Sequence, residues 1–293
     1  MPTKVQANRV VEYAINHQAS EQAKQRGESE NLMQNREQKT YNGHLSKAAT
    51  KRIKTIVPNL ALLAATIQAS EKRKRGLKVE HVQKRLELKK PLITFITLTI
   101  SSPQQHTDNE IKRDCLQPFL ASLKRKGRIA HYLWVAETQQ NGNIHFHIVT
   151  NAYIPKEELR TQWNYYQNLL GYVDRCKFTN PPSTDIQACK SVQNVSRYIA
   201  KYLCKNDNQV TDNTVNPSKE RRKVEGRLWG CDTFTETLTA AIVPEEASEE
   251  VYRETTISTT LAIEDQYYSI YFIDLAKAPT IIALLLEHWN LIT

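Results

Sequence analysis

Residues 130–151 read AHYLWVAETQQNGNIHFHIVTN, and this stretch decides the fold of the central part of the chain. Its two ends are rich in aromatic and β-branched residues, which is typical of strands, and the QQNGN between them is a hairpin signal. We therefore expect strands over residues 130–138 and 143–151. Because side chains alternate across a strand, His145 and His147 project from one face, and the apolar residues beside them project from the other.

The length of the hairpin loop decides where Glu137 lies. A two-residue loop would place Glu137 opposite Phe146, on the wrong face. A three-residue loop over residues 140–142, with Gly142 in the left-handed conformation, places it opposite His145. Two imidazoles and one carboxylate on one face can hold a divalent cation and leave positions open for a phosphate oxygen. The alternative is a set of solvated or hydrogen-bonded side chains on a sheet face.

A second candidate site lies downstream, in residues 197–205, which read RYIAKYLCK. On a helix, four of these residues lie along one stripe at separations of three, four and seven: Tyr198, Lys201, Tyr202 and Lys205. A protonated phenol is a poor nucleophile, and nearby cations favour the phenolate. The alternative is an amphipathic helix whose tyrosines are half-buried.

The order of elements around the hairpin predicts an α+β fold with a largely antiparallel sheet and flanking helices. In this core we expect further strands at residues 92–100 and 186–188, and helices at 108–126, 155–170 and 191–205. Outside the core we expect an extended, loosely ordered or helical arm at 1–40, helices at 45–70 (interrupted near Pro58) and 71–90, a strand at 267–273 and a closing helix at 276–289.

Charge divides the chain into three parts. Residues 1–90 hold 19 Lys and Arg against 8 Asp and Glu (net +11), residues 91–231 hold 19 against 12 (net +7), and residues 232–293 hold 2 against 11 (net −9). A basic front and middle suit a binder of polyanions, although a well-solvated surface gives the same counts. We expect a basic, mainly helical N-terminal extension, a core domain and an acidic C-terminal segment with these bounds.

Cysteine usage and apolar runs indicate the compartment. The five cysteines include no CxxC pair, which favours a reducing cytoplasm and disfavours a zinc ribbon. The first residues lack a continuous apolar stretch, and the apolar runs at 60–67 and 280–286 fall short of the roughly 20 residues that cross a bilayer. We expect a cytoplasmic protein with no membrane partner.

Taken together, these motifs resemble the HUH endonuclease superfamily, in its replication-initiator (Rep) branch, over about residues 91–231. The resemblance rests on residues 95–99 (FITLT), on His145-Phe146-His147, and on Tyr198-Ile-Ala-Lys201 with its overlapping copy Tyr202-Leu-Cys-Lys205. Paired tyrosines are similar to those of two-tyrosine initiators of small single-stranded DNA phages. Residues 226–231 (GRLWGC) are similar to initiators of Bacteroidetes plasmids and phages.

The resemblance implies an HUH/RRM-like domain that nicks and rejoins single-stranded DNA at a replication origin through a 5′-phosphotyrosine, to start and end rolling-circle replication. It implies Mg²⁺ or Mn²⁺ held by Glu137, His145 and His147. Tyr198 and Tyr202 would be the nucleophiles, and Lys201 and Lys205 their cationic neighbours. The sequence contains no GxxxxGK[ST] motif, so unwinding would need a helicase of the bacterial host, together with a host polymerase.

Two alternatives stay open. An HUH-type transposase has the same order of motifs, and a non-catalytic nucleic-acid-binding module could have the same fold. A conjugative relaxase is disfavoured because its tyrosine usually precedes the histidines. A histidine-triad hydrolase needs HxHxH, whereas Val149 occupies the third position.

Overall fold

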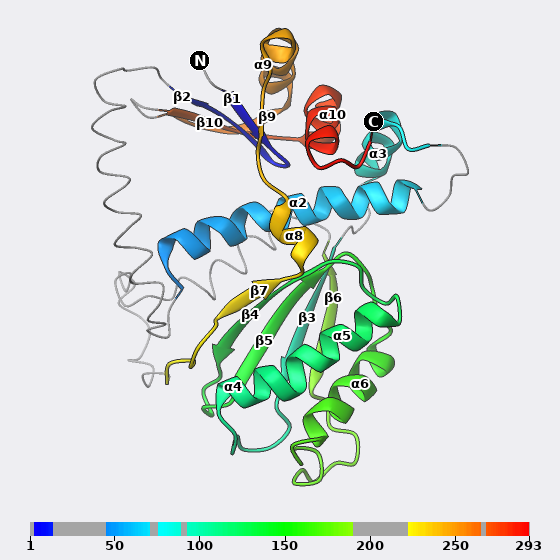
Figure 1. The fold of residues 1–293 in the computed structure, drawn as a ribbon, viewed down its shortest axis with the longest axis vertical. Helices are drawn as coiled ribbons and strands as arrows, with labels where there is room; N and C mark the ends of the chain where they lie inside the picture. Colours follow the sequence, from blue (N-terminus) through cyan, green and yellow to red (C-terminus); the bar gives the residue numbers. More distant parts are fainter. Residues whose placement is uncertain are drawn as a thin grey trace. The chain divides into compact units, whose positions relative to one another are not determined.

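The computed structural model describes residues 3–13, 45–70, 76–88, 93–189, 222–264 and 268–292. The fold belongs to the α+β class, with two antiparallel sheets, flanking helices and a helical N-terminal region, which confirms the expected class (Figure 1). Contacts group the chain into two compact units. Unit 1 comprises Met1–Lys39, Ala61–Lys90 and Glu236–Thr293, and unit 2 comprises Thr40–Leu60 and Pro91–Thr235. The expected division into three functional segments (1–90, 91–231 and 232–293) stays a prediction.

The sheet of unit 2 has five strands in the order β6-β3-β5-β4-β7, and every neighbouring pair is antiparallel. The strands are β3 (Ile93–Thr99), β4 (Tyr132–Thr138), β5 (Ile144–Thr150), β6 (Thr184–Cys189) and β7 (Trp229–Cys231). The three long strands agree with the expected ones. β6 is longer than expected, and β7 was not expected because three residues carry no readable period.

Helices cover one face of this sheet. The expected helix over 108–126 is present but contains a π-helical turn, so it divides into α4 (Asp108–Ile111), η1 (Lys112–Leu116) and α5 (Gln117–Arg125). Figure 1 shows α5 and α6 (Lys156–Asn168) on the same side of the strands. Trp163 of α6 anchors the packing, because its ring contacts Phe119 of α5 and Phe146 of β5 at centroid distances of 5.4 and 6.2 Å.

The sheet of unit 1 joins residues from distant parts of the chain, in the order β8-β1-β2-β10-β9. Its strands are β1 (Thr3–Gln6), β2 (Arg9–Tyr13), β8 (Ala241–Ile242), β9 (Thr259–Glu264) and β10 (Tyr268–Ile273). The expected arm at residues 1–40 is therefore wrong for residues 3–13. Val5 and Val10 are fully buried, and they are strand residues because β10 pairs with β2. Residues 14–44 lie outside the described ranges.

The helices of unit 1 complete its core. They are α3 (Val79–Glu87), η2 (Glu245–Ala247), α9 (Ser248–Ser258), η3 (Leu275–Lys277) and α10 (Pro279–His288). The expected strand at 267–273 and closing helix at 276–289 agree with β10 and with η3 and α10. α9 and β9 were missed. Buried Glu254 of α9 accepts hydrogen bonds from the backbone N of Thr280 and Ile281, at 2.8 and 3.1 Å, and so satisfies the first turn of α10. The short α8 (Thr233–Thr237) follows β7.

Helix α2 (Lys47–Ser70) is continuous through Pro58, so the expected interruption is wrong. Burial of Ile56, Val57 and Leu60 around the proline offsets the roughly 3 kcal/mol that an internal proline costs. Among the described residues, Ala49–Ser70 is the one stretch long and apolar enough to cross a membrane, and 72% of its window is buried. Buried core helices meet the same criteria, so the expected lack of a membrane partner stays a prediction.

Candidate functional site

The loop of the β4–β5 hairpin has the odd length that the sequence required. Thr138 pairs with Ile144, the backbone N of Gln139 donates to Asn143 O at 2.9 Å, and Gly142 has a φ of +85°. This register confirms that Glu137 lies directly opposite His145. Glycine is required at the left-handed position because other residues are strained there.

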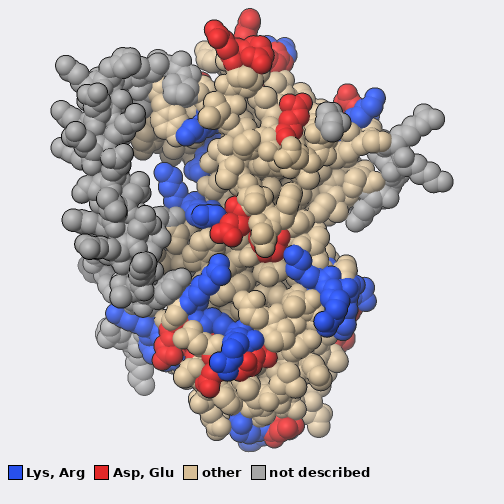
Figure 2. Space-filling view, viewed as in Figure 1, with Lys and Arg blue, Asp and Glu red and all other residues tan. Residues whose placement is uncertain are grey.

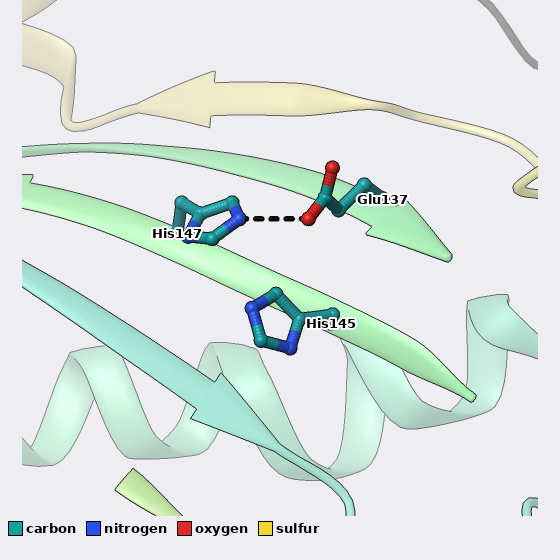
Figure 3. Close-up of side chains that lie close together, drawn as sticks. All are labelled: Glu137, His145 and His147. Carbon is teal, nitrogen blue, oxygen red and sulfur yellow. Dashed lines mark hydrogen bonds and ion pairs between the residues drawn. The ribbon is translucent and has the colours of Figure 1, made fainter. Parts of the chain in front are cut away.

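Glu137, His145 and His147 form one cluster, in which the three ligand atoms lie within 4.8 Å of one another (Figure 3). The Nε2 atom of His147, two residue pairs along the ladder from His145, lies 2.9 Å from Oε1 of Glu137. The imidazoles are 8% and 7% exposed, and Glu137 is partly exposed at the rim. The cluster is therefore shielded from bulk water but reachable from one side.

Strand β3 holds the ring of His147. Thr97 lies opposite His147 in the ladder, with its Oγ1 3.3 Å from Nδ1, and the Phe95 ring stacks on the imidazole at a centroid distance of 5.2 Å. In the tautomer that carries its proton on Nδ1, the ring donates to Thr97 and presents the Nε2 lone pair beside Glu137. A partner of this kind orients a metal-binding histidine and fixes its tautomer.

The donor set fits a divalent cation. Among the described residues, this is the one group of three or more His, Cys, Asp or Glu side chains whose ligand atoms converge in this way. Two nitrogens and a carboxylate suit Mn²⁺ and related ions, and three protein ligands leave coordination positions open. The cluster projects from the face opposite Phe146, which packs under α5 and α6, so these two helices do not cover it.

Replacing Thr97 by Val should weaken Mn²⁺ binding by about 10- to 100-fold, because the imidazole loses the partner that orients it. Isothermal titration calorimetry measures this directly. Thr99→Val is the matched control: Thr99 lies on the same strand, opposite His145 in the ladder, and its Oγ1 donates to Ser183 O at 2.9 Å. An equal loss of affinity in both variants would contradict the assigned role of Thr97.

The predicted tyrosine site lies outside the described residues. The described chain stops at Cys189, the end of β6, and resumes at Arg222, so Tyr198, Lys201, Tyr202 and Lys205 are not placed. Their roles stay predictions. Residues 72–75 (KRKR), part of the basic N-terminal extension, are also outside the described ranges.

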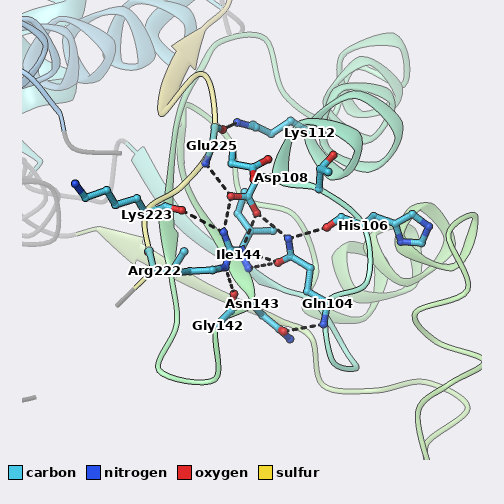
Figure 4. Close-up of polar contacts among 12 residues, drawn as sticks. Gln104, His106, Asp108, Lys112, Gly142, Asn143, Ile144, Arg222, Lys223 and Glu225 are labelled. Carbon is cyan, nitrogen blue, oxygen red and sulfur yellow. Dashed lines mark hydrogen bonds and ion pairs between the residues drawn. The ribbon is translucent and has the colours of Figure 1, made fainter. Parts of the chain in front are cut away.

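An ion pair with the buried carboxylate of Asp108 holds Arg222, the first described residue after the gap. The guanidinium of Arg222 donates to both carboxylate oxygens of Asp108 at 2.7 Å, and Asp108 is only 1% exposed (Figure 4). Gln104 Nε2 and the backbone N of Glu225 also donate to this carboxylate, at 2.7 and 2.9 Å. Burial alone would raise the pKa of Asp108, but these hydrogen bonds and the charge of Arg222 hold it below its ordinary value.

The same network holds the β4–β5 hairpin on both sides of its loop (Figure 4). Arg222 Nε donates to Gly142 O at 2.6 Å, and the backbone N of Ile144, beside His145, donates to Gln104 Oε1 at 2.6 Å. Thr138, beside Glu137, donates from Oγ1 to Arg222 O at 2.7 Å. The network was missed at the sequence level because isolated Asp, Gln and Arg residues far apart in the chain carry no pairing signal.

Asp108→Asn should lower the free energy of unfolding at pH 7 by about 2 kcal/mol, because charge-assisted hydrogen bonds to a buried carboxylate are lost. The folded-state pKa of Asp108 lies below its unfolded value of about 3.9, so its contribution is present above that pH. The contribution is lost as pH falls through the folded-state pKa. Urea unfolding at pH 7 and pH 3 should therefore show a smaller difference from wild type at pH 3.

Asp114→Asn is the control for this prediction. Asp114 also accepts two hydrogen bonds from an arginine, Arg113, but that pair is exposed. Exposed pairs contribute little, so this variant should unfold nearly like wild type. A pH-independent loss for Asp108→Asn would contradict the assignment of a charged carboxylate.

Two basic residues, one in the last turn of α5 and one just after the helix, lie beside acidic side chains. Arg128 pairs with Glu158 at 2.7 Å and Lys124 lies 3.9 Å from Asp232. Figure 2 shows Lys and Arg side chains of the described residues in separate groups with Asp and Glu between them, and acidic side chains gathered over α9. Nearby carboxylates thus neutralise part of the positive charge that the sequence analysis assigned to polyanion binding.

Comparison with known families concerns the part of the chain that carries the cluster. Residues 93–207 match the family model of the replication-associated protein ORF2/G2P. No curated protein and no solved structure matches the chain. The match covers less than half of the sequence, from β3 through the segment with both tyrosines. These residues are therefore similar to replication-associated proteins, which supports a role in DNA replication.

Proposed function

We propose that this chain nicks and rejoins single-stranded DNA through a 5′-phosphotyrosine intermediate, and so starts and ends rolling-circle DNA replication. The observation that carries the proposal is the converging Glu137, His145 and His147 cluster within residues that are similar to replication-associated proteins. Neither feature alone specifies nicking. Together they join a site for a phosphate-activating ion to a segment that offers two phenols.

In this proposal Glu137, His145 and His147 hold Mg²⁺ or Mn²⁺. When bound, such an ion polarises a phosphoryl oxygen and offsets its developing charge. Glu137 stands at the exposed rim of the cluster, so the phosphate would approach from its side. Burial of the two imidazoles limits competition from water.

The chemical step belongs to Tyr198 or Tyr202. The phenol oxygen attacks the phosphorus and loses its proton, and the bond from phosphorus to the 3′ oxygen breaks. The leaving 3′ oxygen takes up a proton, so the products are a 5′-phosphotyrosine and a free 3′-OH that can prime synthesis. Attack of a 3′-OH on the phosphotyrosine reverses these bond changes and rejoins the strand, so no external energy source is consumed. Lys201 and Lys205 would stabilise negative charge on the phosphate.

The proposal places the protein in the cytoplasm of a bacterial cell. Its substrate would be single-stranded DNA at a replication origin, and host helicase and polymerase would extend the reaction. These partners follow from the proposed reaction: nicking produces a primer but neither unwinds nor copies DNA.

The test is a covalent-adduct assay. The full chain is incubated with a pool of labelled single-stranded oligonucleotides, with Mn²⁺ or with a chelator, and separated on denaturing gels. A labelled protein band that requires the metal supports the proposal. Tight DNA binding without an adduct on any sequence would contradict it and favour a non-catalytic nucleic-acid-binding module.

A further inference from the structure

Trp229 differs from the other tryptophans of the chain. Trp134, Trp163 and Trp289 are 3%, 0% and 6% exposed, whereas Trp229 is partly exposed on the edge strand β7. Trp163 and Trp289 donate their indole N–H groups to Thr99 O and Thr239 O, at 2.7 and 3.0 Å. The three buried rings are thus part of the cores, and Trp229 requires a different explanation.

Trp229 lies on the same face of the sheet as the metal-ligand cluster. Val135 of β4 pairs with Trp229 on one side and with His147 on the other. Residues that pair across a ladder share a face, so the three side chains form one row. The backbones of Trp229 and His147 are therefore about 10 Å apart, twice the spacing between neighbouring strands. That distance is on the order of three nucleotides at the ~3.4 Å rise of a stacked strand.

Two guanidinium groups lie near Trp229, one beside its ring and one at its backbone oxygen. The Cζ atom of Arg52 lies 6.0 Å from the centre of the indole, and Arg227 Nε donates to Trp229 O at 2.7 Å. Both arginine side chains are exposed. An aromatic ring that can stack on a base, beside cations that can contact phosphates, is the combination by which proteins bind single strands.

The backbone of β7 is held without help from the indole. A Cβ at Gly230 would lie 2.8 Å from Nε1 of Trp134, so glycine lets β7 approach β4 closely. Beyond the strand, buried Asp232 accepts a hydrogen bond from the backbone N of Tyr132 at 2.9 Å. The ring is therefore presented on a rigid strand instead of being needed to fill the core.

We propose that Trp229, Arg52 and Arg227 form a base-stacking subsite for single-stranded DNA beside the metal-ligand cluster. The subsite rests on the proposed function in that single-stranded DNA is the substrate. It adds a place that holds a base on the order of three nucleotides from the scissile phosphate. Stacking is tolerant of sequence, so the subsite would position the strand without selecting the origin.

The test separates base contacts from backbone contacts. The full chain is titrated, without metal, with an oligothymidylate and with an abasic chain of the same length, and affinities are read by fluorescence anisotropy. Trp229→Ala should weaken binding of the oligothymidylate roughly 5- to 150-fold and leave binding of the abasic chain unchanged. Trp229→Phe should restore most of the loss. Arg52→Gln should weaken both ligands, because both carry phosphates.

Wild-type tryptophan fluorescence gives a second readout. Oligothymidylate should quench it and the abasic chain should not, and Trp289→Phe should keep this quenching. Equal affinities of wild type and Trp229→Ala for oligothymidylate, with equal quenching, would overturn the subsite. An equal loss of affinity for both ligands in Trp229→Ala would also overturn the subsite, because it would indicate a structural role for Trp229. If Trp229→Ala fails to fold, Trp229→Phe and wild-type quenching decide.

Failure of the subsite and failure of the nicking proposal give different results. If oligothymidylate quenches tryptophan fluorescence but no covalent adduct forms, the subsite is supported and the nicking proposal is contradicted. If the adduct forms in a metal-dependent way but Trp229→Ala binds oligothymidylate as tightly as wild type, the subsite is wrong and the nicking proposal stands.

Discussion

The variant with both Tyr198→Phe and Tyr202→Phe is expected to form no covalent protein–DNA adduct. Phenylalanine keeps the aromatic ring but lacks the oxygen that would attack the phosphate. Adduct formation should fall to background at any Mn²⁺ concentration, while binding of single-stranded DNA changes little. The measurement is the denaturing-gel assay with labelled oligonucleotides, together with anisotropy to report binding.

The single variants decide whether one or both tyrosines act as nucleophiles. If both tyrosines are nucleophiles, each single variant keeps an adduct and loses the ability to pass a strand to a second phenol. If one single variant loses the adduct completely, a one-tyrosine mechanism stands. Tyr153→Phe is a suitable control, because Tyr153 is 61% exposed and lies outside the tyrosine segment. An adduct that survives in the double variant would rule out both tyrosines as nucleophiles.

His147→Ala is expected to reduce nicking by on the order of 10²–10³-fold at a Mn²⁺ concentration that saturates wild type. His147 contacts Glu137 directly and lies between that carboxylate and the Thr97 hydroxyl. Its removal therefore takes away one ligand and loosens another. Mn²⁺ affinity by calorimetry should fall in parallel, and binding of single-stranded DNA without metal should be nearly unchanged.

His131→Ala is the matched control for this variant. His131 is also a partly buried histidine paired with a carboxylate, since its Nδ1 lies 3.0 Å from Asp232 Oδ1, but it is outside the cluster. This variant should lose some stability and keep its Mn²⁺ affinity. Nicking that is unaffected by His147→Ala would remove the cluster from the mechanism.

The metal-ligand cluster was accessible from the sequence because local rules determine it. Alternation along a strand puts His145 and His147 on one face, and a left-handed Gly142 at the end of a three-residue loop brings Glu137 to the same face. The contacts that orient the cluster depend on β3. The sequence located that strand but could not give its register, so the pairing of Thr97 with His147 had to come from the structure.

Long-range features were not accessible in the same way. Asp108 and Arg222 are 114 residues apart, and neither belongs to a motif. β1 and β2 look like polar, weakly patterned sequence, and they become strands because β10 completes their sheet. Pro58 reads as a break, and only the burial around it explains why α2 continues. In each case tertiary packing overrides a local preference.

The pairing of β2 with β10 also has a consequence for biosynthesis. β2 (Arg9–Tyr13) is synthesised long before its partner β10 (Tyr268–Ile273), because most of the described chain lies between them. At about 5–20 residues per second, β2 waits on the order of tens of seconds for that partner. The strands of unit 2 all precede β10 in the chain, so they can pair first. During this interval the nascent chain exposes the unpaired edge of β2, and its yield in the cell should depend on chaperones that hold such edges.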